Sequence, residues 1–358
     1  MPLPSIPSSL DHLAACREID EWVGPRRIYP ISFAIPEELV LSGPPAKEQS
    51  SGEGISRGNR KYRFGPGEQD AYYADYQRSY FGLTYKKGGW DCMRHLEIMA
   101  NGTLPFFPGI EDCPRFTMAH HPKEQFQEIY NLYAPAVTLD GLDLSFDPDA
   151  AGDAMAAYDG HVRRMLDHVR SHLTTKAMAR YVLEQSGHSE ARKVLYISGA
   201  RKPDYQCDTL FHGMRSLLGE GCVDVEKIWW MYDSASAEEV GKLYGQGFTY
   251  SRHLPDIDVD RSSIKQRIAA HEFDLIVFGS INRCHDLMPH VRETYDREEV
   301  VMIDGEDYCR VVGWSKKHNP PRRKWSTARK LPREEIIRQG ICFKRELDHA
   351  VLMACKMA

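Results

Sequence analysis

The run 86–105 concentrates residue types that could bind an anion. It begins with two lysines and the glycine pair Gly88-Gly89, and Arg94 follows one helical turn later. Backbone amides of a glycine turn at a helix start attract negative charge, and the helix dipole adds to this attraction. We therefore predict that Lys86, Lys87 and Arg94 converge on one phosphate-sized ligand. The alternative interpretation is an ordinary loop and helix with solvated charges.

The spacing of apolar residues in this run predicts a short helix with one buried face. The face consists of Met93, Leu96, Met99 and Ala100, at three- and four-residue spacing. Asp91, Arg94 and Asn101 lie away from that face, and Glu97 lies near its edge, one turn beyond Arg94. Gly102 marks the helix end, and a strand is expected from Leu104.

The second half of the chain predicts a doubly wound parallel sheet. Near-continuous apolar runs at 193–199, 228–232, 273–280 and 299–305 alternate with helical patterns at 208–218, 262–271 and 285–296. In such sheets, ligands bind beyond the carboxyl ends of the strands. These ends are Ser198-Gly199, Gly279-Ser280 and Asp304-Gly305.

Polar side chains that follow these strands are candidates for chemistry. The possible catalytic groups are Asp204, His212, Asp304 and Asp307, and the further residues expected to face a ligand are Ser280, Asn282, Arg283 and His285. For His212, a packed or surface histidine is the competing interpretation.

The first half predicts a second α/β unit with fewer strands. A helix runs into a strand over 72–84, a helix covers 122–133, a turn-rich acidic connector covers 135–150, and helices span about 150–185. A capped helix is expected at 9–23 and an extended segment at 28–36. Short closing helices are expected at 334–338 and 346–358, on either side of residues 341–345.

Composition is typical of a soluble globular protein of two or three domains. The chain has 358 residues, a hydrophobic fraction of 42%, a charged fraction of 27% and a net charge of −5, which argues against a globally nucleic-acid-binding protein. The nine cysteines are dispersed without CxxC spacing, so we expect reduced thiols rather than disulfides or a zinc site. No apolar run approaches the roughly 18 residues of a membrane span, and the N-terminus lacks signal-peptide features. A cytoplasmic protein is the resulting expectation.

Residues 72–115 resemble the nucleotide-sugar-binding half of GT-B-type glycosyltransferases, particularly exostosin-like and group 1 members. The resemblance lies in Tyr76-x-x-Ser79-x-Phe81-Gly82, Lys87-x-Gly89-Trp90-x-x-x-Arg94-x-x-Glu97, Ala100-x-Gly102-x-x-Pro105 and Glu111-x-x-Pro114. It implies that Glu97 binds the donor ribose and that Lys86, Lys87 and Arg94 meet the diphosphate. It also assigns Ser79, Gly89 and Trp90 to the donor-binding element.

Two departures from that family affect the expected arrangement. The family's second glutamate, eight residues before Glu97, falls on Gly89, and the donor-like half precedes the other half. We therefore expect two Rossmann-like domains facing a cleft, GT-B-like and possibly in permuted order, with 28–36 and 343–347 able to connect the halves. The expected divisions are a donor domain at 1–150, connecting helices at 151–190, an acceptor-side Rossmann-like domain at 191–345 and a closing helix at 346–358.

The resemblance implies transfer of a sugar from a nucleotide-sugar to a hydroxyl acceptor that the sequence does not identify: a glycan, a lipid-linked glycan, a small molecule or a nucleic acid. An inverting transfer needs a carboxylate or imidazole base, and the sequence does not choose among the four candidates. No metal or other cofactor is expected, since cations can neutralise the diphosphate and the DxD pattern Asp256-Ile257-Asp258 is interpreted as a solvated acidic loop. The sequence predicts neither the sugar nor the oligomeric state.

Two other functions stay open. A nucleic-acid acceptor would use Arg57, Arg60, Lys61, Arg63 and the basic segment 315–333, which is otherwise a solvated loop. A nucleotide- or carbohydrate-binding module without catalysis is compatible with the missing second glutamate.

Overall fold

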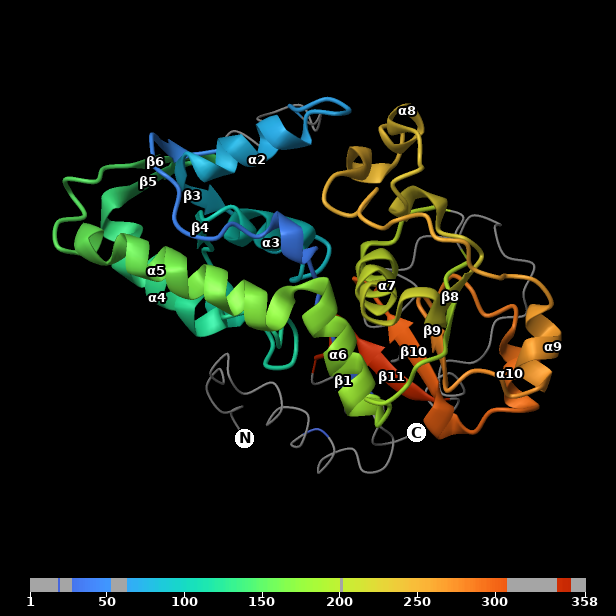
Figure 1. Ribbon diagram of the computed structural model, residues 1–358. Helices are drawn as coiled ribbons and strands as arrows, with labels where there is room; N and C mark the ends of the chain where they lie inside the picture. The colour runs from blue at the N-terminus through green and yellow to red at the C-terminus, as the bar shows by residue number, and fades with distance from the viewer. Residues whose placement is uncertain (1–18, 20–27, 53–62, 200–201, 308–339, 349–358) are drawn as a thin grey trace, which may run out of the picture.

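The chain folds as an α/β protein with two parallel sheets (Figure 1). The computed structural model describes residue 19 and residues 28–52, 63–199, 202–307 and 340–348. A six-stranded sheet and its helices form what we call the large-sheet unit, the described residues among 28–30 and 175–348. A three-stranded sheet, a hairpin and their helices form the small-sheet unit, residues 49–168.

The six-stranded sheet is parallel throughout, as the sequence predicts. Its order is β1-β11-β10-β9-β7-β8. The strands are β1 (Ile28–Pro30), β7 (Val194–Ile197), β8 (Cys222–Val225), β9 (Leu275–Phe278), β10 (Val300–Asp304) and β11 (Ile341–Lys344). Strands β7 to β11 follow the doubly wound order 2-1-3-4-5, whose reversal point lies between β7 and β9.

Both faces of this sheet are covered by helices, because alternate strand residues point to opposite sides. Val194 and Tyr196 pack on one face with α6 (Thr175–Ser186) and α7 (Tyr205–Leu218). Leu195 and Ile197 pack on the other with α9 (Ile264–Ala269) and α10 (Met288–Arg292). Figure 1 shows α9 and α10 at the outer edge of the molecule, away from the small-sheet unit.

The two segments that the sequence singled out as possible connectors lie side by side in the large sheet. Tyr29 of β1 is in register with Phe343 of β11. Strand β1 therefore joins the sheet of the second half, although the first predicted domain began at residue 1. After β1 the chain crosses to the small-sheet unit and returns through α6.

The small-sheet unit has the parallel order β2-β3-β4 with a core of aromatic and aliphatic residues. Its elements are β2 (Gln49–Ser51), α2 (Gln69–Gln77), β3 (Ser79–Leu83), α3 (Met93–Ala100), β4 (Leu104–Phe106), α4 (Lys123–Tyr133), the antiparallel pair β5 (Val137–Asp140) and β6 (Asp143–Phe146), and α5 (Ala154–His168). The remaining short elements are η1 (Glu37–Leu39), η2 (Ile110–Asp112), η3 (Ala134–Ala136), the π-helical turn η4 (Val169–Leu173), η5 (Gly219–Gly221), η6 (Trp229–Met231), α8 (Ala237–Val240), η7 (Tyr244–Gly247) and η8 (Arg297–Glu299).

Several predicted elements were wrong in detail. The strand expected at 228–232 is the turn η6, and the actual strand β8 precedes it. Its Asp224 interrupts the apolar pattern, and the fold tolerates this buried carboxylate because Arg215 and Arg261 pair with it at 2.8 and 2.5 Å. The connector at 135–150 contains the hairpin β5–β6.

Predictions near the chain ends lie mostly outside the described residues. These are the helices at 9–23 and 334–338, of which only residue 19 is described, and most of the closing helix at 346–358. Residues 346–348 are described and are not helical.

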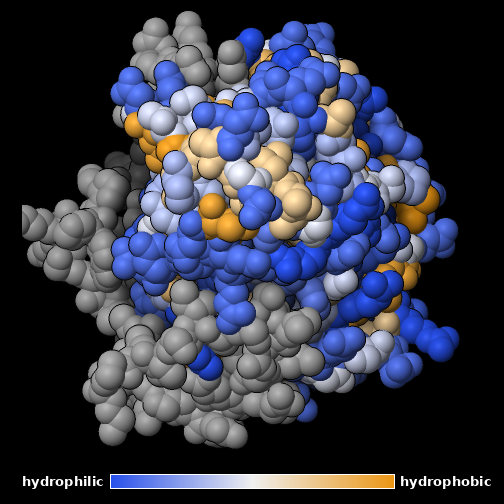
Figure 2. Space-filling view, turned by 90° about the vertical axis from the view of Figure 1, so that its left-hand side faces the viewer, coloured by the Kyte–Doolittle hydropathy of each residue, from blue (hydrophilic) through white to orange (hydrophobic). Residues whose placement is uncertain are grey.

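The described surface of the small-sheet unit is mostly hydrophilic. Figure 2 shows this face, with a small group of apolar residues among many polar ones. Its exposed large hydrophobic residues are Leu132, Leu139 and Leu142. Within the described part of the chain, no helix is long and apolar enough to cross a membrane.

Candidate functional site

Helix α3 and the turn before it form the local structure that the sequence predicts. The helix covers 93–100, Gly102 follows in a left-handed conformation with φ of +64°, and β4 resumes at Leu104. The predicted apolar face is buried. However, Asp91, Glu97 and Asn101 are buried as well, so only part of the expected polar face reaches solvent.

Glu97 is held by hydroxyl groups from both units. Tyr72 of α2 donates to its Oε2 at 2.7 Å, and Thr249, which follows η7, donates to its Oε1 at 2.6 Å. Tyr73 shares a hydrogen bond with the same Thr249 hydroxyl at 2.7 Å. Burial raises the pKa of Glu97, although the hydrogen bonds from Thr249 and Tyr72 and the charge of Arg94 oppose the rise. Both oxygens of the Glu97 carboxylate therefore accept a hydroxyl hydrogen bond.

Arg94 lies beside Glu97 with part of its guanidinium unused. Its Nε donates to Thr84 Oγ1 at 3.3 Å, and its guanidinium carbon lies 5.2 Å from the centre of the Tyr85 ring. Its Nη2 is buried without a hydrogen-bond partner among the described residues. A buried guanidinium donor without an acceptor is costly, so this position favours an incoming anion.

Two lysines extend this cationic region. Burial lowers the pKa of Lys87, and the neighbouring Arg94 charge lowers it further. Lys86 lies against the Trp90 ring at 5.2 Å. Neither lysine, nor Arg94, has a carboxylate within ion-pair distance among the residues that the structure describes.

The turn that follows Gly88-Gly89 holds a carboxyl group of this protein, that of Glu346, whose pKa is raised by burial. The amides of Trp90 and Asp91 donate to Glu346 Oε2 and Oε1 at 3.1 and 3.0 Å. Glu346 follows β11, so the large-sheet unit supplies this carboxylate to the small-sheet unit. A Cβ at Gly89 would lie 2.5 Å from Glu346 Oε1, which explains why the turn has glycine there.

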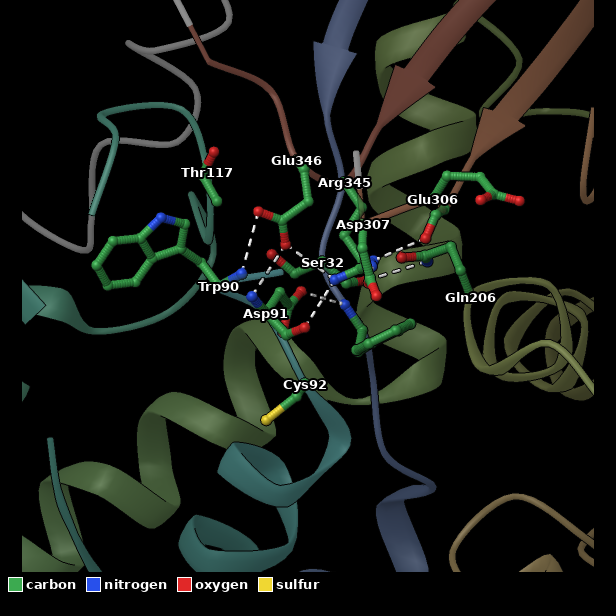
Figure 3. Close-up of polar contacts among 12 residues, drawn as sticks. Ser32, Trp90, Asp91, Cys92, Thr117, Gln206, Glu306, Asp307, Arg345 and Glu346 are labelled. Carbon is green, nitrogen blue, oxygen red and sulfur yellow. Dashed lines mark hydrogen bonds and ion pairs between the residues drawn. The ribbon is translucent and has the colours of Figure 1, made fainter. Parts of the chain in front are cut away.

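Arg345 lies at the centre of this contact, between three carboxylates (Figure 3). Its Nη1 donates to Glu346 Oε1 at 2.9 Å and to the Asp91 carbonyl at 2.7 Å, and its Nη2 pairs with Asp307. Its Nε donates to the Gly305 carbonyl at 3.0 Å. Burial alone would lower the pKa of Arg345, but the three carboxylates raise it. This side chain is 1% exposed and joins the two units.

Asp91 is fixed in the same region. Phe33 N donates to its Oδ2 at 2.8 Å, and His121 Nε2 lies 3.0 Å from its Oδ1. Burial alone would raise the pKa of Asp91, but His121, Arg345 and the Phe33 amide lower it to about 2. Asp91 therefore carries a negative charge inside the protein.

The large sheet brings most of the other predicted residues together at its carboxyl edge. Asp204 caps α7, accepts from Ser280 Oγ at 2.9 Å and pairs with Arg283 at 3.0 Å. These residues lie at the reversal point between β7 and β9. Next to them, Asp304 accepts from Asn282 at 2.7 Å and pairs with Lys344 at 3.2 Å.

Three other residues that the sequence predicted for the site are neither at the glycine turn nor in the cluster around Asp204 and Asp304. His212 contacts Thr175 of α6 at 2.7 Å and faces Glu38, and burial lowers its pKa to about 4. Ser79 lies at the amino end of β3 and donates to the Asp75 carbonyl, whereas Arg94 contacts Thr84, just past the carboxyl end of that strand. His285 is half-buried, and its Nε2 has no hydrogen-bond partner among the described residues.

Asp307 is the predicted catalytic candidate that approaches the glycine turn. A Cβ at Gly88 would lie 2.5 Å from Asp307 Oδ2. Its side chain is 46% exposed, unlike that of Asp304, which is 8% exposed.

The sequence pattern missed the residues through which the large-sheet unit reaches this site. These are Arg345, Glu346 and Thr249. It also missed Tyr72 of α2, which belongs to the small-sheet unit. The signal was the charged run Lys344-Arg345-Glu346 after the apolar residues Ile341–Phe343, a position at the carboxyl edge of a parallel sheet.

The structure describes both aspartates of the DxD pattern. Asp256 accepts from Lys227 at 2.7 Å and from Ser234, and Asp258 is exposed. The described ranges contain no cluster of three or more histidine, cysteine or acidic side chains that could hold a metal ion.

Comparison with known proteins adds no assignment, since no family model, curated protein or solved structure matches the chain. The functional conclusion therefore depends on the sequence and the geometry of the site.

Proposed function

We propose that the protein is a GT-B-like glycosyltransferase that binds a nucleotide-sugar donor on the element formed by 86–97. The main support is the position of Arg94 and Lys87 beside Glu97. These cations have no ion-pair partner in the described part of the chain, and Arg94 Nη2 has no acceptor at all there. A diphosphate would provide negative charge and hydrogen-bond acceptors for both cations, and the ribose hydroxyls would donate hydrogen bonds to Glu97.

In this proposal the hydroxyls of Tyr72 and Thr249 occupy the oxygens of Glu97 when the donor is absent. The ribose would exchange with at least the Thr249 hydroxyl, which belongs to the large-sheet unit. Donor binding is therefore expected to change the contact between η7 and α2.

Asp307 is the proposed base. Its carboxylate approaches Gly88, and although Arg345 pairs with its Oδ1, its side chain is 46% exposed, whereas that of Asp304 is 8% exposed. In an inverting transfer, the acceptor oxygen would form a bond to the anomeric carbon as the bond to the diphosphate breaks. The acceptor proton would pass to Asp307, and Lys87 and Arg94 would stabilise the leaving diphosphate.

The test is a thermal-shift screen of nucleoside diphosphates and their sugar conjugates, followed by a donor-hydrolysis assay with the best ligand. The proposal expects a rise in melting temperature with one nucleotide class and slow release of that nucleoside diphosphate from its sugar conjugate. Stabilisation without any hydrolysis or transfer would favour the non-catalytic binding module. No stabilisation by any nucleotide would refute the proposal.

The nucleic-acid alternative gains no support from the described structure. Of its suggested footprint, only Arg63 is described, and its guanidinium lies 5.8 Å from the centre of the Phe64 ring. Arg57, Arg60, Lys61 and the segment 315–333 lie outside the described residues.

A further inference from the structure

We propose that Glu346 is an internal competitor for the glycine turn, so that an anionic ligand must displace its carboxylate in order to bind. The inference rests on the proposed function in one respect: it takes the diphosphate of a nucleotide as the ligand that competes. It assigns an autoinhibitory role to a residue that the sequence pattern did not single out.

The first support is the way the turn holds the carboxylate. Two successive amides, of Trp90 and Asp91, donate to the two oxygens of Glu346 (Figure 3). Adjacent amides that converge on one anion also bind phosphate oxygens in proteins. The occupant and a phosphate group thus need the same donors and cannot use them together.

The second support is the shape of the turn. Both glycines face carboxylates of the large-sheet unit: a Cβ at Gly89 would lie 2.5 Å from Glu346 Oε1, and one at Gly88 would lie 2.5 Å from Asp307 Oδ2. Side chains at these positions would clash with the two carboxylates. The glycine pair therefore lets acidic groups approach the turn from the side of the large-sheet unit.

The third support is the unequal use of the neighbouring cations. Glu346 pairs with Arg345 at 2.9 Å, but it has no ion pair with Arg94 or Lys87. A diphosphate would gain these two cations in addition to the turn amides. A displaced Glu346 could retain Arg345 as a partner, so it would not be left as an unpaired buried charge.

The experiment compares pyrophosphate binding by the wild-type chain, Glu346→Gln and the control Glu220→Gln in calorimetric titrations. Glu220 is exposed on η5, so the control makes the same change in net charge away from the turn. We expect Glu346→Gln to bind pyrophosphate about tenfold more tightly than wild type, because the competitor loses its charge-assisted hydrogen bonds. The control should match wild type. Unchanged or weaker binding by Glu346→Gln, or absence of binding by both proteins, would overturn the inference.

A second variant and a second observable cover the case in which Glu346→Gln does not fold. Glu346→Asp keeps the negative charge, but its shorter side chain should not reach the amides of Trp90 and Asp91, so this variant should also bind pyrophosphate more tightly than wild type. In wild type selectively labelled with ¹⁵N-tryptophan, the Trp90 amide resonance should shift as pyrophosphate saturates the protein. A Trp90 resonance that stays in place at saturation would mean that the turn is not the binding site.

The proposed function can fail separately from this inference. Tighter pyrophosphate binding by Glu346→Gln without nucleotide-sugar hydrolysis by any variant would support the Glu346 contact and refute the transferase. Hydrolysis that depends on Arg94, together with equal affinity in wild type and Glu346→Gln, would refute only the role of Glu346.

Discussion

Replacement of Arg345 by methionine should destabilise the protein strongly, because it removes a buried cation from between three carboxylates. Methionine keeps much of the side-chain volume and removes the charge. Arg345 is 1% exposed and contacts Asp307 and Glu346 with its guanidinium, in addition to two backbone carbonyls. Breaking a buried ion pair by removing one partner costs about 3–5 kcal/mol, since the remaining charge is left uncompensated.

The assay is urea unfolding followed by tryptophan fluorescence, with Arg164→Met as the matched control. Arg164 pairs with Glu128 at 3.0 Å, but both side chains are about half exposed, at 53% and 48%. Surface pairs of this kind contribute less than about 1 kcal/mol. We expect the free energy of unfolding to fall by about 3–5 kcal/mol in Arg345→Met and by less than about 1 kcal/mol in the control. Equal losses in the two variants would refute the idea that Arg345 joins the units.

Two further predictions concern the same contact. Gly89→Ala should destabilise the protein by about 1–3 kcal/mol in the same urea assay, because its Cβ would lie 2.5 Å from an oxygen of the firmly held Glu346. Gly88→Ala should lower the free energy of unfolding less than Gly89→Ala does, because the Asp307 side chain that its Cβ would meet is 46% exposed and can move. A larger decrease in Gly88→Ala than in Gly89→Ala would contradict this prediction. The pKa of Asp91 is lowered from 3.8 to about 2, so its charged form stabilises the folded state fully above pH 3.8 and this contribution disappears as the pH falls toward 2. As the pH falls from 3.8 toward 2, the free energy of unfolding of the wild type should therefore decrease by about 2 kcal/mol more than that of Asp91→Asn. Equal decreases in the two proteins would refute a lowered pKa for Asp91.

Local patterns predicted the elements around α3 because each signal was contained in a few neighbouring residues. The three- and four-residue spacing of Met93, Leu96 and Met99 defined the helix, and Gly102 defined its end. The parallel sheet of the second half was predictable for a similar reason, since buried parallel strands are apolar along their whole length. Strand β8 was not, because the pairing of Asp224 with Arg215 and Arg261 depends on residues distant in the sequence.

The candidate site was only partly predictable, because both units build it. The sequence predicted an external anion at the glycine turn, and it could not show that Glu346, which contacts the turn in this structure, lies there, because Glu346 is more than 250 positions away in the chain. The burial of Glu97 by Thr249 is also a long-range contact. His212 was selected from its position after a strand, but the packing of α7 on α6 directs it toward Thr175. The roles proposed for Arg94, Glu97 and Asp307 remain predictions.

The central claim is that Arg94 binds the diphosphate of a nucleotide, and the most direct measurement is calorimetric titration of wild type, Arg94→Ala and Arg78→Ala. The titrant is whichever of ADP, GDP, UDP and CDP gives the largest thermal shift. Arg78 is the control, because it lies on the same unit, is 49% exposed and pairs with Asp75 at 3.2 Å. We predict that wild type and Arg78→Ala bind with equal affinity and that Arg94→Ala binds at least about tenfold more weakly while remaining folded. Equal affinity in all three proteins would contradict the claim.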